Sequence, residues 1–335
     1  FLIYFLGFGR GPHRRMTMNR RSFHAASLLV VCIIALGRAF SLHGLHRLSV
    51  SNRLSAQPAN RPCSTTVQMS AIAEGDLVTI FGATGGVGYL VANKLVDSGY
   101  KVRALVRDVP KAKAMFGDRP VEFVEGNFVS GAGVDRAIEG AAAIVCCTGT
   151  TAFPTAKWAG GNTPVNVDKA AVERLAARCA APGGAPALKR FALLTSVGVE
   201  RTGQMPFALL NAFGVLDCKR AAEAAVVAAA AAARAAGPGP RWDHLVLRPG
   251  RLVGAPFSNA DVAAALALTQ PADRRGVRLA PGDALAGDLE RADAAEALVR
   301  GLMEEAAGGK TLCLVNAPGP APGAAFWAEA FAGLP

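Results

Sequence analysis

The glycine-rich segment Gly82–Gly88 has the composition and the position of a phosphate-binding loop. It follows an apolar, β-branched run at 77–81 and precedes a helical stretch at 89–95. Glycines at such a junction permit a tight turn, close approach of the backbone to a diphosphate, and tight packing of the helix on the strand. Free amides at the positive end of the helix would hold the phosphates. The residues predicted to do so are Gly82, Thr84, Gly85, Gly86, Val87 and Gly88; a glycine turn without a ligand is the alternative.

The end of the next predicted strand, 101–106, bears on which nicotinamide cofactor binds. In NAD-binding proteins an acidic residue about 20 residues beyond the loop binds the ribose hydroxyls. Here Val106 stands in that place and Arg107 follows, so a ribose phosphate would meet a guanidinium. This pattern favours NADP(H). Asp108, one residue later, keeps NAD open as the alternative, and Arg107 could be only a solvated strand end.

The order of these motifs resembles the atypical short-chain dehydrogenase/reductases of the NmrA-like, NAD(P)-binding branch. The resemblance spans essentially the whole chain after the first 70 residues. It is carried by Gly82–Gly88, Val106–Asp108, Glu125–Phe128, Leu194–Val199, Lys219 and Arg248–Gly250. The stretch Cys147–Pro154, with Trp158 and the segment 162–164 after it, looks especially like plastid members known from land plants.

The resemblance implies further contacts with the cofactor. Asn127 should lie beside the adenine, where the family more often has aspartate, and an amide oxygen can still accept from the exocyclic amine. Thr148 and Gly149 should line the ribose side, and Pro249 and Gly250 should pass near the nicotinamide. Phe128, Cys147 and Lys219 complete the cofactor-binding set that the resemblance implies.

Active members of the wider family use a tyrosine four residues before a lysine, with a serine nearby, to move a proton. By resemblance, Ser196 and Lys219 are the candidate catalytic residues. Val215 stands where the tyrosine is expected, and the tyrosines of the chain, at positions 4, 89 and 100, lie elsewhere. The usual proton donor is therefore missing. Ser196 could instead be an ordinary turn residue and Lys219 an ordinary surface lysine.

Three functions remain open. The first is an oxidoreductase in which NADPH carries the difficult step and the proton comes from Lys219, Ser196 or water. The second is a catalytically inactive NADP(H)-binding assembly or regulatory factor for a plastid protein complex, which is what some plastid relatives are believed to be. The third, an isomerase or epimerase acting on a nucleotide sugar, depends on the missing tyrosine and ranks lower.

The elements that must position these residues alternate between short strands and longer helices, which predicts βαβ units and a parallel sheet. The expected fold is α/β, a doubly wound parallel Rossmann sheet flanked by helices, with a small C-terminal substrate region. The predicted strands are 77–81, 101–106, 121–124, 143–147, 190–195, 244–247 and 312–315. The predicted helices are 88–98, 134–139, 167–180, 217–236 and 292–305.

Substrate specificity is expected from the Trp158 region and from the segments 200–213 and 255–290, which follow strand ends. An apolar floor would be made by Met205, Phe207, Leu209, Leu210, Phe213 and Phe257, unless these residues are simply core. The substrate itself, an unknown small molecule, is not indicated.

The positive charge of the chain is concentrated in its first part. The chain carries +11, but residues 1–69 hold nine arginines and no acidic residue, which leaves 27 basic against 25 acidic residues in the rest. This distribution argues against a nucleic-acid partner for the body of the protein.

Residues 1–70 are predicted to be a bipartite leader, disordered or cleaved, ahead of a Rossmann domain at 71–335. An apolar run, Leu28–Leu36, is too short to span a membrane and is followed by Ala39-Phe40 and an acid-free segment rich in Ser, Arg and Leu. A secretory signal followed by a transit peptide predicts import into the plastid stroma; plain secretion and an uncut membrane anchor are the alternatives.

Cysteine and histidine chemistry is poorly supported. The five cysteines beyond the leader have scattered spacing and no C-x-x-C, which argues against a zinc site and a disulfide framework, and His244 is the only histidine there. Cys218 adjoins Lys219, whose charge could lower its thiol pKa and allow redox control; a buried, inert thiol is the alternative.

Overall fold

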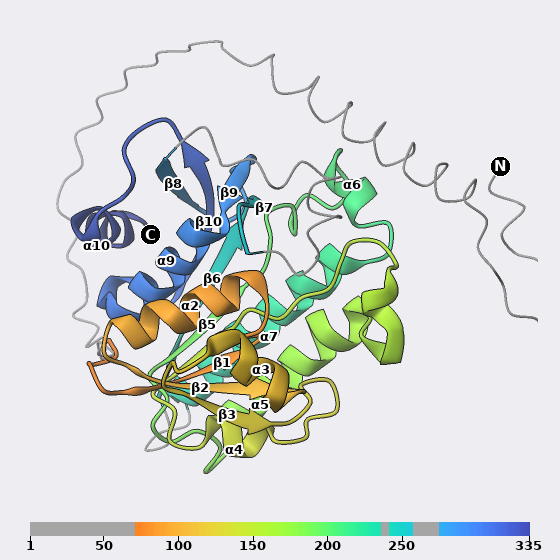
Figure 1. Ribbon diagram of the computed structural model, residues 1–335. Helices are drawn as coiled ribbons and strands as arrows, with labels where there is room; N and C mark the ends of the chain where they lie inside the picture. The colour runs from red at the N-terminus through yellow and green to blue at the C-terminus, as the bar shows by residue number, and fades with distance from the viewer. Residues whose placement is uncertain (1–70, 236–240, 257–274) are drawn as a thin grey trace, which may run out of the picture. The chain divides into compact units, whose positions relative to one another are not determined.

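The computed structural model describes residues 71–235, 241–256 and 275–335, all within the unit Cys63–Pro335 (Figure 1). The predicted leader, 1–70, lies outside the described residues. Within them an eight-stranded sheet has the order β3-β2-β1-β4-β5-β6-β10-β8. Its strands are β3 (Val121–Glu125), β2 (Lys101–Val106), β1 (Leu77–Phe81), β4 (Ala143–Cys146), β5 (Arg190–Leu194), β6 (Asp243–Pro249), β10 (Lys310–Ala317) and β8 (Gly276–Pro281).

Every neighbouring pair in this sheet is parallel except β10 and β8, which are antiparallel. The strand order reverses direction between β1 and β4, because β1 pairs with β2 on one side and with β4 on the other. In open α/β sheets ligands bind outside the carboxyl ends of the strands at such a point. The glycine loop, which follows β1, is therefore placed at the expected binding position.

Helices cover both faces of the sheet, and each face has its own hydrophobic core. On one face lie α2 (Gly86–Asp97), α3 (Val109–Phe116), α9 (Arg291–Met303) and α10 (Ala324–Gly333). On the other lie α4 (Val134–Ile138), α5 (Ala171–Ala180) and α7 (Val215–Ala235). Figure 1 shows α2 and α9 side by side. The predicted fold, a doubly wound Rossmann sheet with a small C-terminal region, is confirmed.

Helix α7, which contains an alanine-rich run at 228–233 and covers nearly all of the helix predicted at 217–236, packs against the rest of the fold. Ala222, Val226, Ala230 and Ala233 of α7 are buried at intervals of three and four residues, which is the spacing of one helical face. Their short side chains let α7 lie close to α5 and to the sheet. None of the described helices combines the length and the unbroken hydrophobicity that a bilayer crossing requires.

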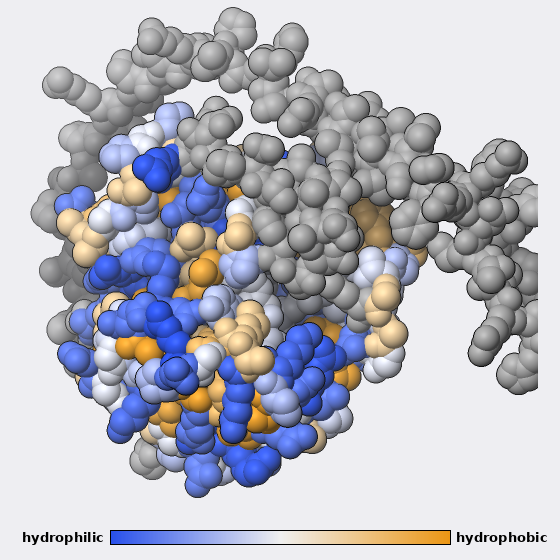
Figure 2. All heavy atoms as spheres, in the orientation of Figure 1, coloured by the Kyte–Doolittle hydropathy of each residue, from blue (hydrophilic) through white to orange (hydrophobic). Residues whose placement is uncertain are grey.

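Several elements of the C-terminal region were not predicted. A second, two-stranded parallel sheet joins β7 (Arg251–Val253), directly after β6, to β9 (Asp288–Glu290). The short helix α6 (Phe207–Leu210) precedes α7. The part of the predicted substrate segment that falls at 257–274 lies outside the described residues. On the face drawn in Figure 2, hydrophilic and hydrophobic residues are interspersed.

Candidate functional site

The glycine loop connects β1 to α2 in a space that admits almost no side chains. Gly82 has a φ of +91°, and a Cβ there would lie 2.9 Å from the carbonyl carbon of Cys147. A Cβ on Gly88 would lie 2.2 Å from the carbonyl oxygen of Gly82. The loop backbone is therefore packed directly against the end of β4 and against its own helix, which requires glycine at both positions.

The N-terminus of α2 offers its amides to an anion. Gly85 is the residue before the helix, and no side chain caps this end. No acidic residue stands in the first turn, where a carboxylate would compete with a bound phosphate. The Val87 side chain points into the core, so only its backbone could face a ligand, whereas Thr84 is exposed. These features fit the diphosphate of a dinucleotide.

Arg107 and Asp108 are adjacent but differ in what they contact. Arg107 is exposed at the end of β2 and makes no hydrogen bond or ion pair with another described residue. Asp108 caps α3, because its carboxylate accepts from the amide of Lys111 at 2.9 Å. The Asp108 carboxylate, which would have bound the ribose of NAD, thus caps a helix, whereas the Arg107 guanidinium is available to a ligand.

Asn127 and Phe128 form the turn after β3. The Asn127 side-chain oxygen accepts from the amides of Val129, at 2.8 Å, and Ser130, at 3.3 Å. The oxygen expected to accept from an adenine amine is therefore already occupied within the loop. Phe128 packs on Phe81 with ring centroids 5.1 Å apart, which joins this turn to the end of β1.

Lys219 lies in a buried ionic cluster with Asp168 and Thr150. Its ammonium contacts the Asp168 carboxylate at 2.6 Å; the Asp168 side chain is fully buried and the Lys219 side chain 13 % exposed. The amide of Thr150 donates to Asp168 at 3.1 Å, and its hydroxyl donates to the same oxygen. A Cβ on Gly149 would lie 3.2 Å from the Lys219 nitrogen. The cluster therefore lies against the segment that follows β4.

Sequence reasoning missed Asp168. It belongs to a π-helical stretch, Val165–Ala170, that runs directly into α5. Its neighbours on the buried side, Val167 and Ala171, are apolar. A single acidic residue among buried apolar positions was the available signal, because a buried carboxylate needs a partner. Irregular helical turns of this kind are frequent at functional sites.

Ser196 is not joined to Lys219 by a hydrogen bond. Its hydroxyl donates to the carbonyl oxygen of Val197 at 2.9 Å. The amide of Val197 donates in turn to the carbonyl oxygen of Pro249, so the ends of β5 and β6 are held together. Gly250 is tightly enclosed, since a Cβ there would lie 2.3 Å from the Gly287 carbonyl oxygen.

No tyrosine reaches this site from the part of the chain that the structure describes. Val215 begins α7 and is buried. Tyr89 lies in α2 and packs on Phe116, and Tyr100 precedes the first residue of β2, at the amino end of the sheet. Among the described residues, therefore, no tyrosine is placed to act as the usual proton donor.

A buried ionic network supports the helix that carries Lys219. Arg248 of β6 pairs with Glu223 of α7 at 2.6 Å and with Glu200 at 2.6 Å, and the Thr195 hydroxyl donates to Glu223. Burial alone would lower the pKa of Arg248, but the hydrogen bonds and charges of the two glutamates raise it above its ordinary value. Glu223 follows Lys219 by one helical turn, so the network holds α7 against β5 and β6.

The cysteines near the site are poor nucleophiles. Burial raises the pKa of the Cys146 and Cys147 thiols. Burial also raises the pKa of Cys218, and the Asp168 charge adds to this more than the Lys219 charge opposes it. The Lys219 charge acts in the expected direction on the pKa of Cys218, but burial and the Asp168 charge outweigh it, so the thiol corresponds to the buried alternative.

The aromatic residues expected to form an apolar floor separate into two groups. Phe207 is buried beneath Gly198 and stacks under the Arg201 guanidinium, 4.4 Å from its ring centroid. Phe213 is half exposed and contacts Phe153 and Trp158. Met205 and Leu210 are also exposed, Leu209 is partly buried, and Phe257 lies outside the described residues.

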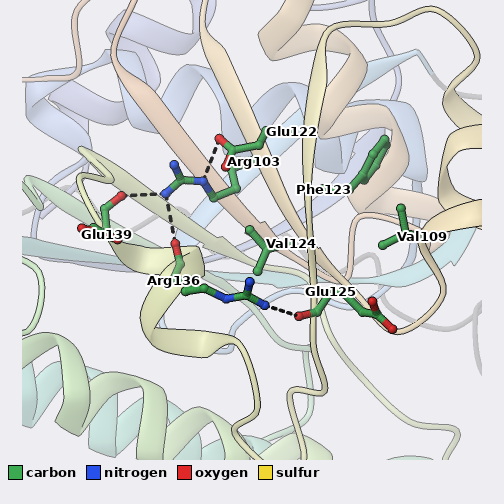
Figure 3. Close-up of a pocket in the computed structure, with 8 residues that line it drawn as sticks. All are labelled: Arg103, Val109, Glu122, Phe123, Val124, Glu125, Arg136 and Glu139. Atoms are coloured by element: carbon green, nitrogen blue, oxygen red, sulfur yellow. Dashed lines mark hydrogen bonds and ion pairs between the residues drawn. The ribbon is translucent and has the colours of Figure 1, made fainter.

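A hollow of about 500 Å³ beside the edge strand β3 includes none of the predicted site residues (Figure 3). It is lined by Arg103, Val109, Glu122, Phe123, Val124, Glu125, Arg136 and Glu139. The charged residues there largely satisfy one another. Arg103 pairs with Glu122 at 2.9 Å and donates to the carbonyl oxygen of Glu139 at 2.6 Å, at the end of α4.

Residues 82–305 match the sequence profile of a family described as NAD(P)H-binding. Among curated proteins, the chloroplastic protein TIC 62 of Arabidopsis thaliana is 32 % identical over 171 residues, which cover 46 % of this chain and 25 % of TIC 62. The chloroplastic protein At2g34460 of the same plant is 31 % identical over 147 residues, 41 % of this chain and 49 % of the relative. The matched region is thus a quarter to a half of these relatives.

Among solved structures, the oxidoreductase ylbE of Lactococcus lactis superposes with a TM-score of 0.53 at 18 % identity, covering 77 % of this chain and 95 % of that one. Yeast methylglyoxal/isovaleraldehyde reductase Gre2, complexed with NADPH, gives 0.52 at 14 % identity, covering 72 % and 78 %. At these identities the likeness shows the fold alone.

Proposed function

The chain belongs to the NAD(P)H-binding family of atypical short-chain dehydrogenase/reductase-like proteins, and from this premise we propose that it is an NADP(H)-dependent oxidoreductase acting on a small molecule. The observation that carries the choice of NADP(H) is the contrast between Arg107 and Asp108. The guanidinium is exposed and without a partner among the described residues, whereas the carboxylate is engaged as the cap of α3. A ribose phosphate at the end of β2 would pair with Arg107.

The residues of the loop and of the ionic cluster have distinct roles in this proposal. The amides of Gly86 and Val87, at the uncapped start of α2, would hold the diphosphate, whereas the Gly85 amide already donates to the carbonyl oxygen of Gly82 at 2.9 Å. The Gly149 backbone, which lies against Lys219, would face the ribose side. Lys219, fixed by Asp168, retains N–H donors beyond the one that it gives to the carboxylate. These donors can bind the ribose hydroxyls or the substrate oxygen.

When bound, NADPH supplies the hydride. Reduction of a carbonyl then needs one proton on the oxygen, which Lys219, Ser196 or water provides. The Ser196 hydroxyl would have to turn away from the Val197 carbonyl oxygen to donate it. Lys219 is held in position by the Asp168 carboxylate, and Asp168 is held in turn by Thr150, in the segment after β4.

A second function, NADP(H) binding without turnover in a plastid assembly or regulatory role, is favoured by one observation. Val215 is buried where a proton-donating tyrosine is expected, so the site lacks its usual acid. The chloroplastic names of two relatives and the leader-like residues 1–70 support a plastid location for either function.

Oxidation of NADPH against a panel of quinones and carbonyl compounds separates these functions. Turnover in the unaltered chain that is lost in a Lys219→Ala protein shown by circular dichroism to be folded supports the oxidoreductase. Tight NADPH binding without turnover on any compound supports the binding factor, and no affinity for NADPH or NADH contradicts both.

A further inference from the structure

Three aromatic side chains, the exposed Phe153 and Phe213 and the partly buried Trp158, form a group that we call the aromatic cluster. The Phe213 ring lies 6.0 Å from each of the other two, with interplanar angles of 77° to Phe153 and 88° to Trp158. Phe213 is 50 % exposed and Phe153 37 % exposed. Large aromatic side chains are normally buried, so a group of three that remains accessible calls for a partner.

The cluster is held in place by polar contacts rather than by core packing. The indole N–H of Trp158 donates to the Thr151 hydroxyl at 3.1 Å, and that hydroxyl donates to the carbonyl oxygen of Phe153 at 2.8 Å. Thr151 therefore orients the Trp158 indole and holds the backbone of Phe153. A ring that is already fixed, as the Trp158 indole is, loses little conformational entropy when a ligand binds.

The cluster and the ionic cluster of Lys219 share one segment of the chain. Thr150 binds Asp168, which holds Lys219, and the next residue, Thr151, holds Trp158. Phe213 comes just before α7, whose first turns carry Lys219. The rings and the lysine ammonium are thus placed by the same two segments of the chain.

The charge of the site restricts the chemistry of that molecule. Lys219 is already neutralised by Asp168 at 2.6 Å, so a ligand carboxylate or phosphate would compete with a buried carboxylate for the same ammonium. A neutral carbonyl oxygen can accept one of the remaining N–H donors and leave the ion pair intact. Aromatic rings bind flat, conjugated ligands through offset or edge contacts.

We propose that the aromatic cluster is the substrate subsite and that it takes an uncharged, planar aromatic carbonyl compound, with the ring on Phe213 and its neighbours and the oxygen toward Lys219. This rests on the proposed oxidoreductase function and names its substrate class. It assigns specificity to Phe153, Trp158 and Phe213, residues that lie outside the glycine loop in the sequence.

Titration calorimetry of the full chain with two matched ketones tests this proposal. The probes are 2-acetonaphthone, which is planar, and 2-acetyldecalin, its saturated counterpart. We expect measurable binding of the planar ketone and affinity at least about tenfold weaker for the saturated one. Phe213→Leu keeps apolar surface but removes the ring, and should weaken 2-acetonaphthone binding about tenfold, equivalent to about 1.4 kcal/mol. Val165→Ala, at an exposed apolar position outside the cluster, should change nothing.

Quenching of tryptophan fluorescence by acrylamide gives a second readout. Trp242 and Trp327 are fully buried, so the accessible signal comes from Trp158. Bound 2-acetonaphthone should protect it. Equal affinity for the two ketones, or an unchanged affinity in Phe213→Leu, would overturn the subsite and leave a protein partner as the occupant of the cluster.

The NADPH titration is run on the same samples and is independent of this result. Intact NADPH binding with no ketone binding refutes the subsite and spares the cofactor assignment. Ketone binding with no NADPH binding refutes the proposed function and leaves the cluster as a ring-binding site.

Discussion

The Lys219 ammonium and the Asp168 carboxylate are 2.6 Å apart, and the carboxylate has no exposure to solvent. Breaking a buried pair by removing one partner is costly because it leaves the other charge uncompensated. We expect Lys219→Met to lower the free energy of unfolding by about 3 kcal/mol or more. Asp168→Asn should cost less, because the lysine retains some access to water. The double variant should lose less unfolding free energy than the two single variants lose together.

Urea denaturation of the four proteins measures this coupling. Asp217→Asn, which removes an exposed carboxylate paired with Arg220 on the same helix, is the matched control and should change stability by less than about 1 kcal/mol. Additive losses in the double variant would show that the pair does not stabilise the fold as a unit.

Arg107→Ala should remove the preference for NADPH. A charge-assisted hydrogen bond to phosphate contributes about 1.5–3 kcal/mol, so the affinity for NADPH should fall by a factor of at least about 10, while that for NADH stays constant. Fluorescence titration with both cofactors measures the ratio. Arg119→Ala, which removes another exposed arginine that pairs with Asp97, should leave the ratio as it is. Equal affinity of the unaltered chain for NADPH and NADH would refute the NADP assignment.

Asp108→Ala should affect stability and not cofactor choice. Loss of a helix-capping carboxylate costs about 1 kcal/mol of stability. Asp108→Asn should keep most of that stability, because asparagine also caps helices. Thermal unfolding measures the change in stability, and NADH titration measures the cofactor affinity. A marked loss of NADH affinity in Asp108→Asn would show that the carboxylate binds ribose after all.

Gly88→Ala should abolish NADPH binding and destabilise the chain, since the new Cβ would lie 2.2 Å from the Gly82 carbonyl oxygen. The helix and the loop cannot both keep their positions. Gly203→Ala is the control, because a Cβ there meets nothing within 4 Å. Circular dichroism and cofactor titration report on both effects, and a Gly88→Ala protein with normal affinity would contradict the described loop geometry.

Stability should decrease between pH 7.5 and 5.5 in a way that depends on His244. Burial lowers the pKa of His244 below its ordinary 6.5, and the Arg234 charge adds to this. Below pH 6.5 the unfolded chain binds a proton that the native imidazole resists, so the native state loses up to about 1.4 kcal/mol at one pH unit below that value. Urea midpoints should drop less in His244→Gln. Identical pH profiles for the two proteins would exclude the histidine as the cause.

Much of the fold could be predicted because local pattern and tertiary structure agree. Runs such as 77–81 are largely buried within a parallel sheet, and near-continuous hydrophobic sequence is the signature of that environment. The second sheet could not be predicted in the same way. Strands β7 and β9 have three residues each and are too short to show a periodicity.

The candidate site was predictable where backbone geometry dictates residue type, and less so where a contact joins distant side chains. Gly82 and Gly88 could be predicted from the sequence, because a Cβ at either position would clash with the backbone. Asp168 and Lys219 are 51 residues apart and meet only when η4, the π-helical stretch before α5, lies beside α7. The local sequence around neither residue predicts that the two side chains form an ion pair.

The charged hollow lies beside β3, an edge strand of the sheet. An edge strand leaves its outer backbone groups available to a second chain. Here Glu122 and Glu125 border the open edge with Arg103 and Arg136 close by, so an incoming strand would strip water from several ions at once. The protein is thereby protected against edge-to-edge aggregation on that side.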